Sequence, residues 1–267
     1  MTNKTDKKIL FFDIDGTILS EETNTIPPSA LNAIARAREN GHLAFINTGR
    51  PYATIDQMIK DVGFDGFVCG CGTNIYFQGN EIYHQTLDED TRRKIINLAY
   101  LYKVDCMLEG KTATCFKEEM LHPFMAFLKD KYLKEGHNIL TYPNDSALPF
   151  DKFTVWYTPE GDIESFKDAI KDEFTIIQRA DDFIEVVPKN CSKASGIDFL
   201  TDYLDMSHDS TISFGDSTND LSMLIHTKES VAMGNSNPIL FDKVTYITTD
   251  VDDNGIENAL KHFKVID

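Results

Sequence analysis

Short apolar runs alternate with helical spacing of apolar positions along the first third of the chain. Residues 9–12, 42–50 and 66–77 have the composition of strands, and glycines interrupt the last of them. Residues 27–41 and 51–63 have helical spacing, and the first of these helices begins near prolines and ends at a glycine. This alternation is typical of a parallel sheet with helices on both faces.

The middle of the chain has a different pattern, in which the predicted strands are polar at alternate positions. This pattern indicates an α+β unit with a partly exposed sheet. We expect strands at 152–158, 174–179 and 182–187, and helices near 120–135 and 160–171.

The strand–helix pattern then returns, with elements expected at 193–204 (helix), 211–217 (strand), 218–226 (helix), 230–234 (strand) and 244–249 (strand), and a short last helix. The chain therefore leaves its first domain and comes back to it. We predict an α/β fold with a Rossmann-like parallel-sheet core formed by residues 1–80 and 188–267, and an inserted α/β cap domain at 81–187.

Composition narrows the range of partners. The 267 residues are 42% hydrophobic, enough for one or two domain cores. The chain has 43 Asp and Glu residues and 26 Lys and Arg residues, so its formal net charge is −17. A field of that sign repels nucleic acid and anionic membranes, so we expect neither as a partner. An anionic substrate would need positive charge supplied locally, by a metal ion or a few basic side chains.

We expect a cytoplasmic protein, because the sequence has no recognisable targeting signal and its cysteines are scattered. The opening "MTNKTDKKIL" has no leader-peptide pattern, and no segment approaches the roughly 18 consecutive apolar residues of a membrane helix. The five scattered cysteines read as reduced thiols. Cys69 and Cys71 are separated by one glycine, but no second pair or nearby His completes a zinc site, so a metal or redox role for them is the minority interpretation. The sequence leaves the oligomeric state open.

Four polar clusters follow strands or begin helices: "DIDGT" (13–17), "NTGR" (47–50), "SK" (192–193) and "GDSTND" (215–220). In open parallel sheets, reacting groups collect at the carboxyl ends of the strands. Each cluster has an ordinary structural interpretation, as a turn, a helix N-cap or a solvated lysine. Their joint occurrence in this order favours a catalytic site.

These clusters match, in order, the four motifs of the haloacid dehalogenase-like phosphatase superfamily. The long insertion, with "AMGN" at 232–235, resembles the Cof-type subfamily (class IIB), which has a large α/β cap. The resemblance spans nearly the whole chain. It implies a Mg²⁺-dependent phosphatase that hydrolyses a small phosphorylated metabolite, such as a sugar phosphate, through an aspartyl-phosphate, with the cap closing over the site.

The paired acids of "DIDGT" fit that chemistry. A carboxylate attacks phosphorus only if a cation removes the charge repulsion, and two-step hydrolysis needs an acid and later a base. The resemblance implies that Asp13 is the nucleophile and a side-chain metal ligand. It implies that Asp15 is the acid and base, gives its backbone carbonyl to Mg²⁺, and that Asp216 is the third protein ligand.

The remaining polar residues are expected to support the phosphate and the metal. Asp220 is expected to orient ligands or Lys193, with direct ligation the minority interpretation. Arg50 has two open interpretations, substrate contact and a supporting ion pair. Gly16 and Thr17 are expected to shape the turn, with the Thr17 hydroxyl bonded to local backbone. Phosphate-binding groups are expected at Ile14, Thr48, Gly49, Lys193 and Asn219.

Two other functions stay open at this stage. A sugar phosphomutase of the same superfamily would use Asp15 for a second hydroxyl instead of water, and a non-catalytic regulator would use the site to bind a metabolite. The chain also departs from the family in one place: many Cof-type sequences have Asn-Gly after the third core strand, where this chain has Cys71-Gly72. Within the cap, Phe153, Trp156 and Tyr157 are expected to pack the sheet on a helix.

Overall fold

The computed structural model describes residues 7–144 and 146–267. The expectation of no leader peptide concerns in part residues 1–6, which lie outside the described residues. The chain divides into two compact units: Met1–Gly49, Gln57–Ile82 and Ser192–Asp267 in the first, and Arg50–Asp56 and Tyr83–Cys191 in the second. The segment Arg50–Asp56, expected in the core domain, thus groups with the second unit, and the domain boundaries given above remain a prediction.

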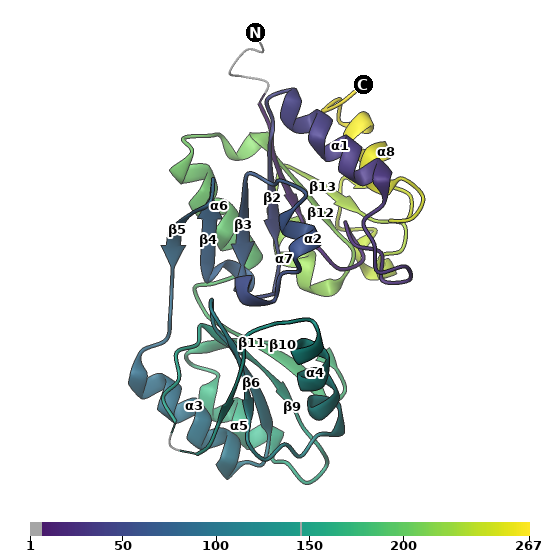
Figure 1. Cartoon of the computed structure of the whole chain (residues 1–267). Helices are drawn as coiled ribbons and strands as arrows, with labels where there is room; N and C mark the ends of the chain where they lie inside the picture. The colour runs from purple at the N-terminus through teal and green to yellow at the C-terminus, as the bar shows by residue number, and fades with distance from the viewer. Residues whose placement is uncertain (1–6, 145) are drawn as a thin grey trace. The chain divides into compact units, whose positions relative to one another are not determined.

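The first unit is built on an eight-stranded sheet (Figure 1). The strands from β14 to β3 run parallel, and β4 is antiparallel to its neighbour β3. This confirms the predicted parallel-sheet core. In spatial order the strands are β14 (Tyr246–Ile247), β13 (Glu229–Ala232), β12 (Thr211–Gly215), β1 (Ile9–Phe12), β2 (Leu43–Asn47), β3 (Gly66–Cys69), β4 (Asn74–Phe77) and β5 (Asn80–His84).

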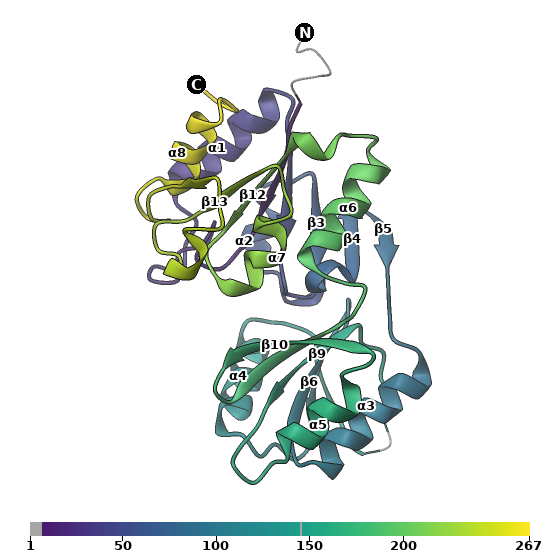
Figure 2. The ribbon, with the colours of Figure 1, turned by 180° about the vertical axis from the view of Figure 1, so that it is seen from behind.

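Helices cover both faces of this sheet, as the alternating pattern predicts. Figures 1 and 2 show α1 and α2 over one face and α6 and α7 over the other, with α8 beside α1. Their bounds are α1 (Pro28–Glu39), α2 (Gln57–Lys60), α6 (Lys193–Tyr203), α7 (Leu221–Leu224) and α8 (Gly255–His262).

The single helix predicted over 51–63 is wrong. A 3₁₀ turn at Tyr52–Thr54 and the short α2 replace it, because Ile55 between them has an extended backbone (φ −77°, ψ 122°). The Ile55 side chain is buried, so tertiary packing overrides the helical spacing of this segment.

The second unit has a six-stranded sheet flanked by helices on both faces. Its strands follow the spatial order β10 (Phe174–Ala180), β11 (Phe183–Pro188), β9 (Lys152–Trp156), β6 (Asp105–Glu109), β7 (Thr114–Lys117) and β8 (Ile139–Tyr142). The sequence predicts β9, β10 and β11 but not the other three, which are short and have no clear alternation. One apolar cluster joins the sheet to α3 (Glu89–Leu101) and α5 (Ile163–Ile170), and another joins it to α4 (Pro123–Lys134).

The prediction of a partly exposed sheet is wrong for its central strands. Every residue of β6 and β9 is buried, although β9 alternates polar and apolar side chains. The charged side chain of Lys152 is satisfied within the sheet, since its Nζ lies 2.7 Å from Glu109 Oε2 and 2.8 Å from Glu185 Oε1. Phe153 is in the apolar cluster beneath α3 and α5, and Trp156 stacks on Phe183, so both pack as expected.

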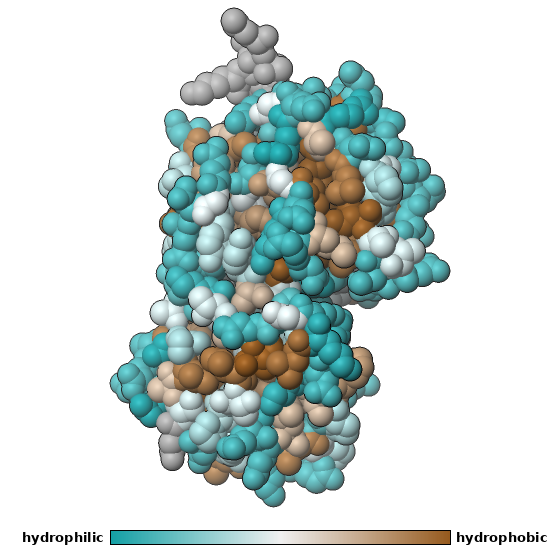
Figure 3. Space-filling view, viewed as in Figure 1, coloured by the Kyte–Doolittle hydropathy of each residue, from teal (hydrophilic) through white to brown (hydrophobic). Residues whose placement is uncertain are grey.

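The surface of the first unit has an apolar hollow of about 360 Å³ beside α1 and α2. Ile26, Leu31, Met58 and Val62 contribute its apolar lining, in the region where Figure 3 shows a brown patch. No predicted site residue lines this hollow. Among the residues described, no helix combines the length and the hydropathy needed to cross a membrane.

Candidate active site

Three of the four polar clusters meet because their strands are neighbours. β1 lies between β2 and β12 and pairs in parallel with both, with Phe12 opposite Ile46 and Phe214. The chain therefore leaves all three strands at the same edge of the sheet, where Asp13, Thr48 and Asp216 follow. Asp13 is fixed there by its backbone N–H, which donates to the carbonyl of Phe214 at 3.0 Å.

The fourth cluster brings a lysine into contact with the acids. Lys193 is the first residue of α6, and Ser192 and Ser195 cap that helix reciprocally. The buried Lys193 Nζ lies 2.5 Å from Asp13 Oδ1 and 2.5 Å from Asp220 Oδ1. Burial opposes the charge of Lys193, but the two carboxylates outweigh it and raise its pKa above the usual value. The lysine is therefore a fixed positive charge against the predicted nucleophile.

The acids in this cluster outnumber the lysine and fit a divalent metal ion. Carboxylate oxygens of Asp13, Asp216 and Asp220 lie within 4.8 Å of one another. Burial and then the charge of Asp220 raise the pKa of Asp13 to about 7, against the effect of Lys193. Burial, Asp220 and Asp13 raise that of Asp216 to about 8. Among the residues that the structure describes, Asp216 Oδ1 is also buried without a hydrogen-bond partner. An unpartnered carboxylate oxygen in an anionic cluster is what a hard, oxygen-preferring cation would satisfy.

Asp220 is held differently from Asp13 and Asp216, because both of its oxygens are engaged. Oδ1 accepts from Lys193, and Oδ2 accepts from the backbone N–H groups of Asp216 and Ser217, each at 3.0 Å. Asp220 thus contacts both Lys193 and the loop that carries Asp216, and its role in orienting them stays a prediction.

The turn after Asp13 leaves room for Asp216. Gly16 has a left-handed backbone (φ +71°), and a Cβ there would come within 2.5 Å of Asp216 Oδ2. The expectation for Thr17 is wrong: its buried hydroxyl has no hydrogen-bond partner among the described residues, and the N–H groups of residues 17, 18 and 19 all donate to the carbonyl of Ile14 instead.

The structure shows the surroundings of the predicted phosphate-binding residues but no phosphate contact. Thr48 is buried, and its backbone N–H donates to Val68. Asn219 accepts a hydrogen bond from the hydroxyl of Ser217 through Oδ1, which leaves its amide nitrogen as the group able to donate. Phosphate contacts at Ile14, Thr48, Gly49, Lys193 and Asn219 stay a prediction.

Two asparagines connect segments of the site, and no sequence pattern predicted their role. Asn47 Nδ2 donates to the carbonyl of Lys193 at 2.9 Å and so ties the end of β2 to the start of α6. Asn235 Nδ2 donates to the carbonyl of Gly16 at 2.8 Å, while its Oδ1 accepts from Val251 N–H. Both lie in quoted motifs, "NTGR" and "AMGN", but only the tertiary structure shows what they contact.

Arg50 forms an ion pair within the second unit, whereas Cys69 and Cys71 are buried in the first. Arg50 Nη1 lies 2.9 Å from Asp56 Oδ2, which favours the ion-pair interpretation of this residue. Cys69 and Cys71 are both buried and form no disulfide bond, and burial raises the pKa of the Cys69 thiol. Cys71 has φ +55°, a region in which Asn is enriched, so the cysteine occupies a backbone conformation suited to the family's asparagine.

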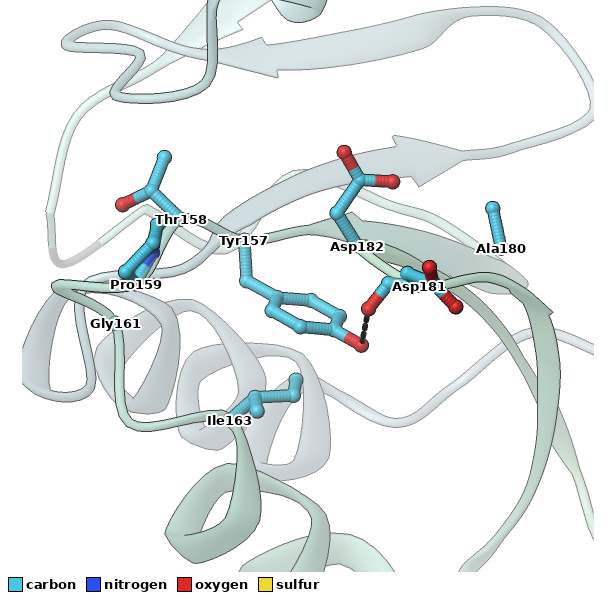
Figure 4. A pocket seen from close by; sticks show the side chains of 8 residues that line it. All are labelled: Tyr157, Thr158, Pro159, Gly161, Ile163, Ala180, Asp181 and Asp182. Carbon is cyan, nitrogen blue, oxygen red and sulfur yellow. Dashed lines mark hydrogen bonds between the residues drawn. The ribbon is translucent and has the colours of Figure 1, made fainter.

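The second unit contains a surface pocket of about 560 Å³ that none of the predicted site residues lines. Figure 4 shows its lining, in which the Tyr157 hydroxyl donates to the carbonyl of Asp181 at 2.6 Å. Tyr157 therefore borders this pocket, whereas its neighbour Trp156 is buried in the sheet.

Comparison with known proteins shows the family of this chain. The family model of haloacid dehalogenase-like hydrolases matches residues 10–260. The candidate phosphatase YkrA from Bacillus subtilis (strain 168) is 30% identical over 98% of this chain and 99% of that protein. The 5-amino-6-(5-phospho-D-ribitylamino)uracil phosphatase YitU of the same strain is 24% identical over 97% of this chain and 98% of that protein.

Among solved structures, the sugar phosphatase BT4131, of subclass IIB, is 28% identical with a TM-score of 0.83. The match covers 97% of this chain and all of that one. Hydrolases of this kind typically use a metal ion, which agrees with the unpartnered oxygen of Asp216. The chain belongs to the haloacid dehalogenase-like hydrolases and, within them, to the Cof-type group with a subclass IIB cap.

Proposed function

We propose that the protein is a Mg²⁺-dependent phosphatase that hydrolyses a small phosphorylated metabolite, such as a sugar phosphate, through an aspartyl-phosphate on Asp13. The observation that carries this proposal is the contact of Lys193 Nζ with Asp13 Oδ1 at 2.5 Å, beside the unpartnered oxygen of Asp216. The named phosphatases among the relatives support the reaction, and their differing substrates leave the metabolite itself to be found.

Asp13 would attack the phosphorus atom, with Lys193 offsetting the negative charge of the incoming phosphoryl oxygens. Mg²⁺, held by the side chains of Asp13 and Asp216 and the carbonyl of Asp15, would supply further positive charge to the phosphoryl group. The Asp15 side chain would protonate the leaving alcohol and then take a proton from the water that releases phosphate. The half-buried position of Asp15, against the deep burial of Asp13, supports this division of roles.

The first test is phosphate release from an aryl phosphate, with Mg²⁺ and with a chelator. We expect metal-dependent release by the wild type and a loss of at least about 10³-fold in Asp13→Asn, because an amide cannot form the acyl-phosphate. Asp15→Asn should slow both steps by about 10²–10⁴-fold. Asp61→Asn, the same change at a site beside the apolar hollow, serves as the matched control.

Outcomes other than loss of activity are also informative. Turnover retained in Asp13→Asn would refute the nucleophile. Silence of the wild type on the aryl phosphate and on a broad panel of phosphorylated metabolites would refute the phosphatase, and a phosphate label persisting on Asp13 for minutes would point to a regulator instead.

A further inference from the structure

A second group of metal-ligand side chains lies in the first unit, apart from the acidic cluster. Asp198 is in α6, His208 comes three residues before β12, and His226 lies between α7 and β13. Both histidines therefore sit at the amino ends of their strands, whereas Asp216 follows the carboxyl end of β12. In residues 7–144 and 146–267, this group and the acidic cluster are the two that could hold a metal ion.

The three side chains already face one another. One ligand atom from each lies within 4.8 Å of the other two. His226 Nε2 is 2.6 Å from Asp198 Oδ1, and the rings of His208 and His226 are 4.7 Å apart at 84°. The His208 Nε2 atom is buried and has no hydrogen-bond partner in the described part of the chain. A buried imidazole nitrogen without a partner is uncommon and calls for a ligand.

The donor set selects the kind of ion. Two imidazoles and one carboxylate are typical ligands of a catalytic-type zinc site, with a fourth position left for water. Mg²⁺ prefers oxygen ligands and would not be favoured here. The Asp198 side chain is 56% exposed, so an ion has access from solvent and the carboxylate is able to turn towards it.

We infer that Asp198, His208 and His226 form a binding site for one Zn²⁺-like ion, separate from the proposed Mg²⁺ site. Such an ion would join α6 to the segments that precede β12 and β13. Because α6 begins with Lys193, the site is connected through a single helix to the residue that contacts Asp13. An ion bound by the folded chain and not by the unfolded one stabilises the fold.

Co²⁺ is the probe, because tetrahedral coordination with imidazole gives strong visible absorption whereas an octahedral oxygen site gives little. Untagged, metal-free protein is titrated with Co²⁺ in saturating Mg²⁺, and the bound Co²⁺ is then displaced by Zn²⁺. We expect one strongly absorbing Co²⁺ per chain, and we expect Asp216→Asn to keep it.

His208→Gln and His226→Gln should each weaken this binding by at least about 10-fold. Loss of a residue that only supports a metal ligand already costs about that much, and these residues are ligands themselves. His262→Gln is the matched control, since that ring stacks on Tyr246 outside the group. Circular dichroism checks that each variant is folded. No tetrahedral absorption in the wild type, or its survival in both folded histidine variants, would overturn the site. Its loss in Asp216→Asn would instead place the ion in the acidic cluster.

Discussion

Single residues of the acidic cluster have little freedom, because each one constrains another. Lys193 contacts Asp13 and Asp220, and Asp220 accepts from the backbone of Asp216. The absence of a side chain at Gly16 leaves the space that Asp216 occupies. Small changes here should therefore alter the proposed metal site and not only local stability.

Gly16→Ala should displace Asp216 and lower Mg²⁺-dependent phosphate release by at least about 10-fold. The left-handed backbone should cost a further 1–2 kcal/mol or so in the free energy of unfolding. Gly79→Ala is the control, because Gly79 also has a left-handed φ (+79°) but has nothing within 4 Å of the added Cβ. Activity and urea unfolding separate the two effects, and equal activity losses in both variants would contradict the argument.

Lys193→Met should leave Asp13 and Asp220 buried without a cation, at a cost of about 3–5 kcal/mol in the free energy of unfolding near pH 8. The pKa of Asp13, already about 7 in the wild type, should rise further without the lysine. The loss should therefore shrink as pH falls to about 5.5, since a protonated Asp13 needs no cation beside it.

Urea unfolding at both pH values, in chelator, measures this difference. Lys171→Met removes an exposed ion pair with Asp168 and should change the free energy by less than about 0.5 kcal/mol. A Lys193→Met deficit that does not vary with pH would argue against buried carboxylates as its cause.

Among the elements, β9 shows best how context changes the meaning of a pattern. Its alternation of polar and apolar residues predicts one exposed face, yet Lys152 is only 2% exposed. Glu109 and Glu185 come from β6 and β11, the two strands beside β9. Burial raises the pKa of Glu109, while the charge of Lys152 opposes that rise. The three side chains form a unit that no single strand predicts.

Lys152→Met should destabilise the second unit by about 3–5 kcal/mol, because two buried carboxylates then lack their shared cation. Adding Glu109→Gln and Glu185→Gln to that variant should recover most of the loss, since no unpaired charge remains. Denaturant unfolding followed by Trp156 fluorescence reports this unit, as Trp156 is the chain's single tryptophan and lies at the end of β9. A triple variant as unstable as Lys152→Met would show that side-chain shape, not charge, matters there.

At the scale of the whole molecule, excess negative charge should make a metal ion and protons compete for the same carboxylates. The formal net charge is −17, and the pKa values of Asp13 and Asp216 are raised from 3.8 to about 7 and about 8. Between pH 4 and 8, Asp13 and Asp216 of the folded, metal-free chain hold protons that the same groups have released in the unfolded chain. Its stability should therefore fall as pH rises through this range.

Bound Mg²⁺ should remove this loss, because it favours the ionised carboxylates. We expect the rise in melting temperature on adding Mg²⁺ to be larger at pH 8 than at pH 6, by on the order of 5 °C. Thermal unfolding with Mg²⁺ and with chelator measures it, and Asp216→Asn should reduce both the slope and the metal effect. A Mg²⁺ effect of equal size at both pH values would refute the competition.

Local features of the chain were sufficient to predict the parallel core and the residues of the acidic cluster. Apolar runs that end in "DIDGT", "NTGR" and "GDSTND" place polar groups at strand ends, and parallel pairing then brings those ends together. Such patterns depend on neighbouring residues, so they can be read without knowing the fold. The motif match and the family comparison extend this reading to the whole chain.

Only the tertiary structure decided which distant residues satisfy one another. Burial of Lys152, the support that Asn47 and Asn235 give to the site, and the extended Ile55 all depend on which elements become neighbours. The meeting of Asp198 with His208 and His226 likewise needs α6 packed beside the segments before β12 and β13. Burial and charge pairing are properties of the packed chain, and no local pattern of residues encodes them.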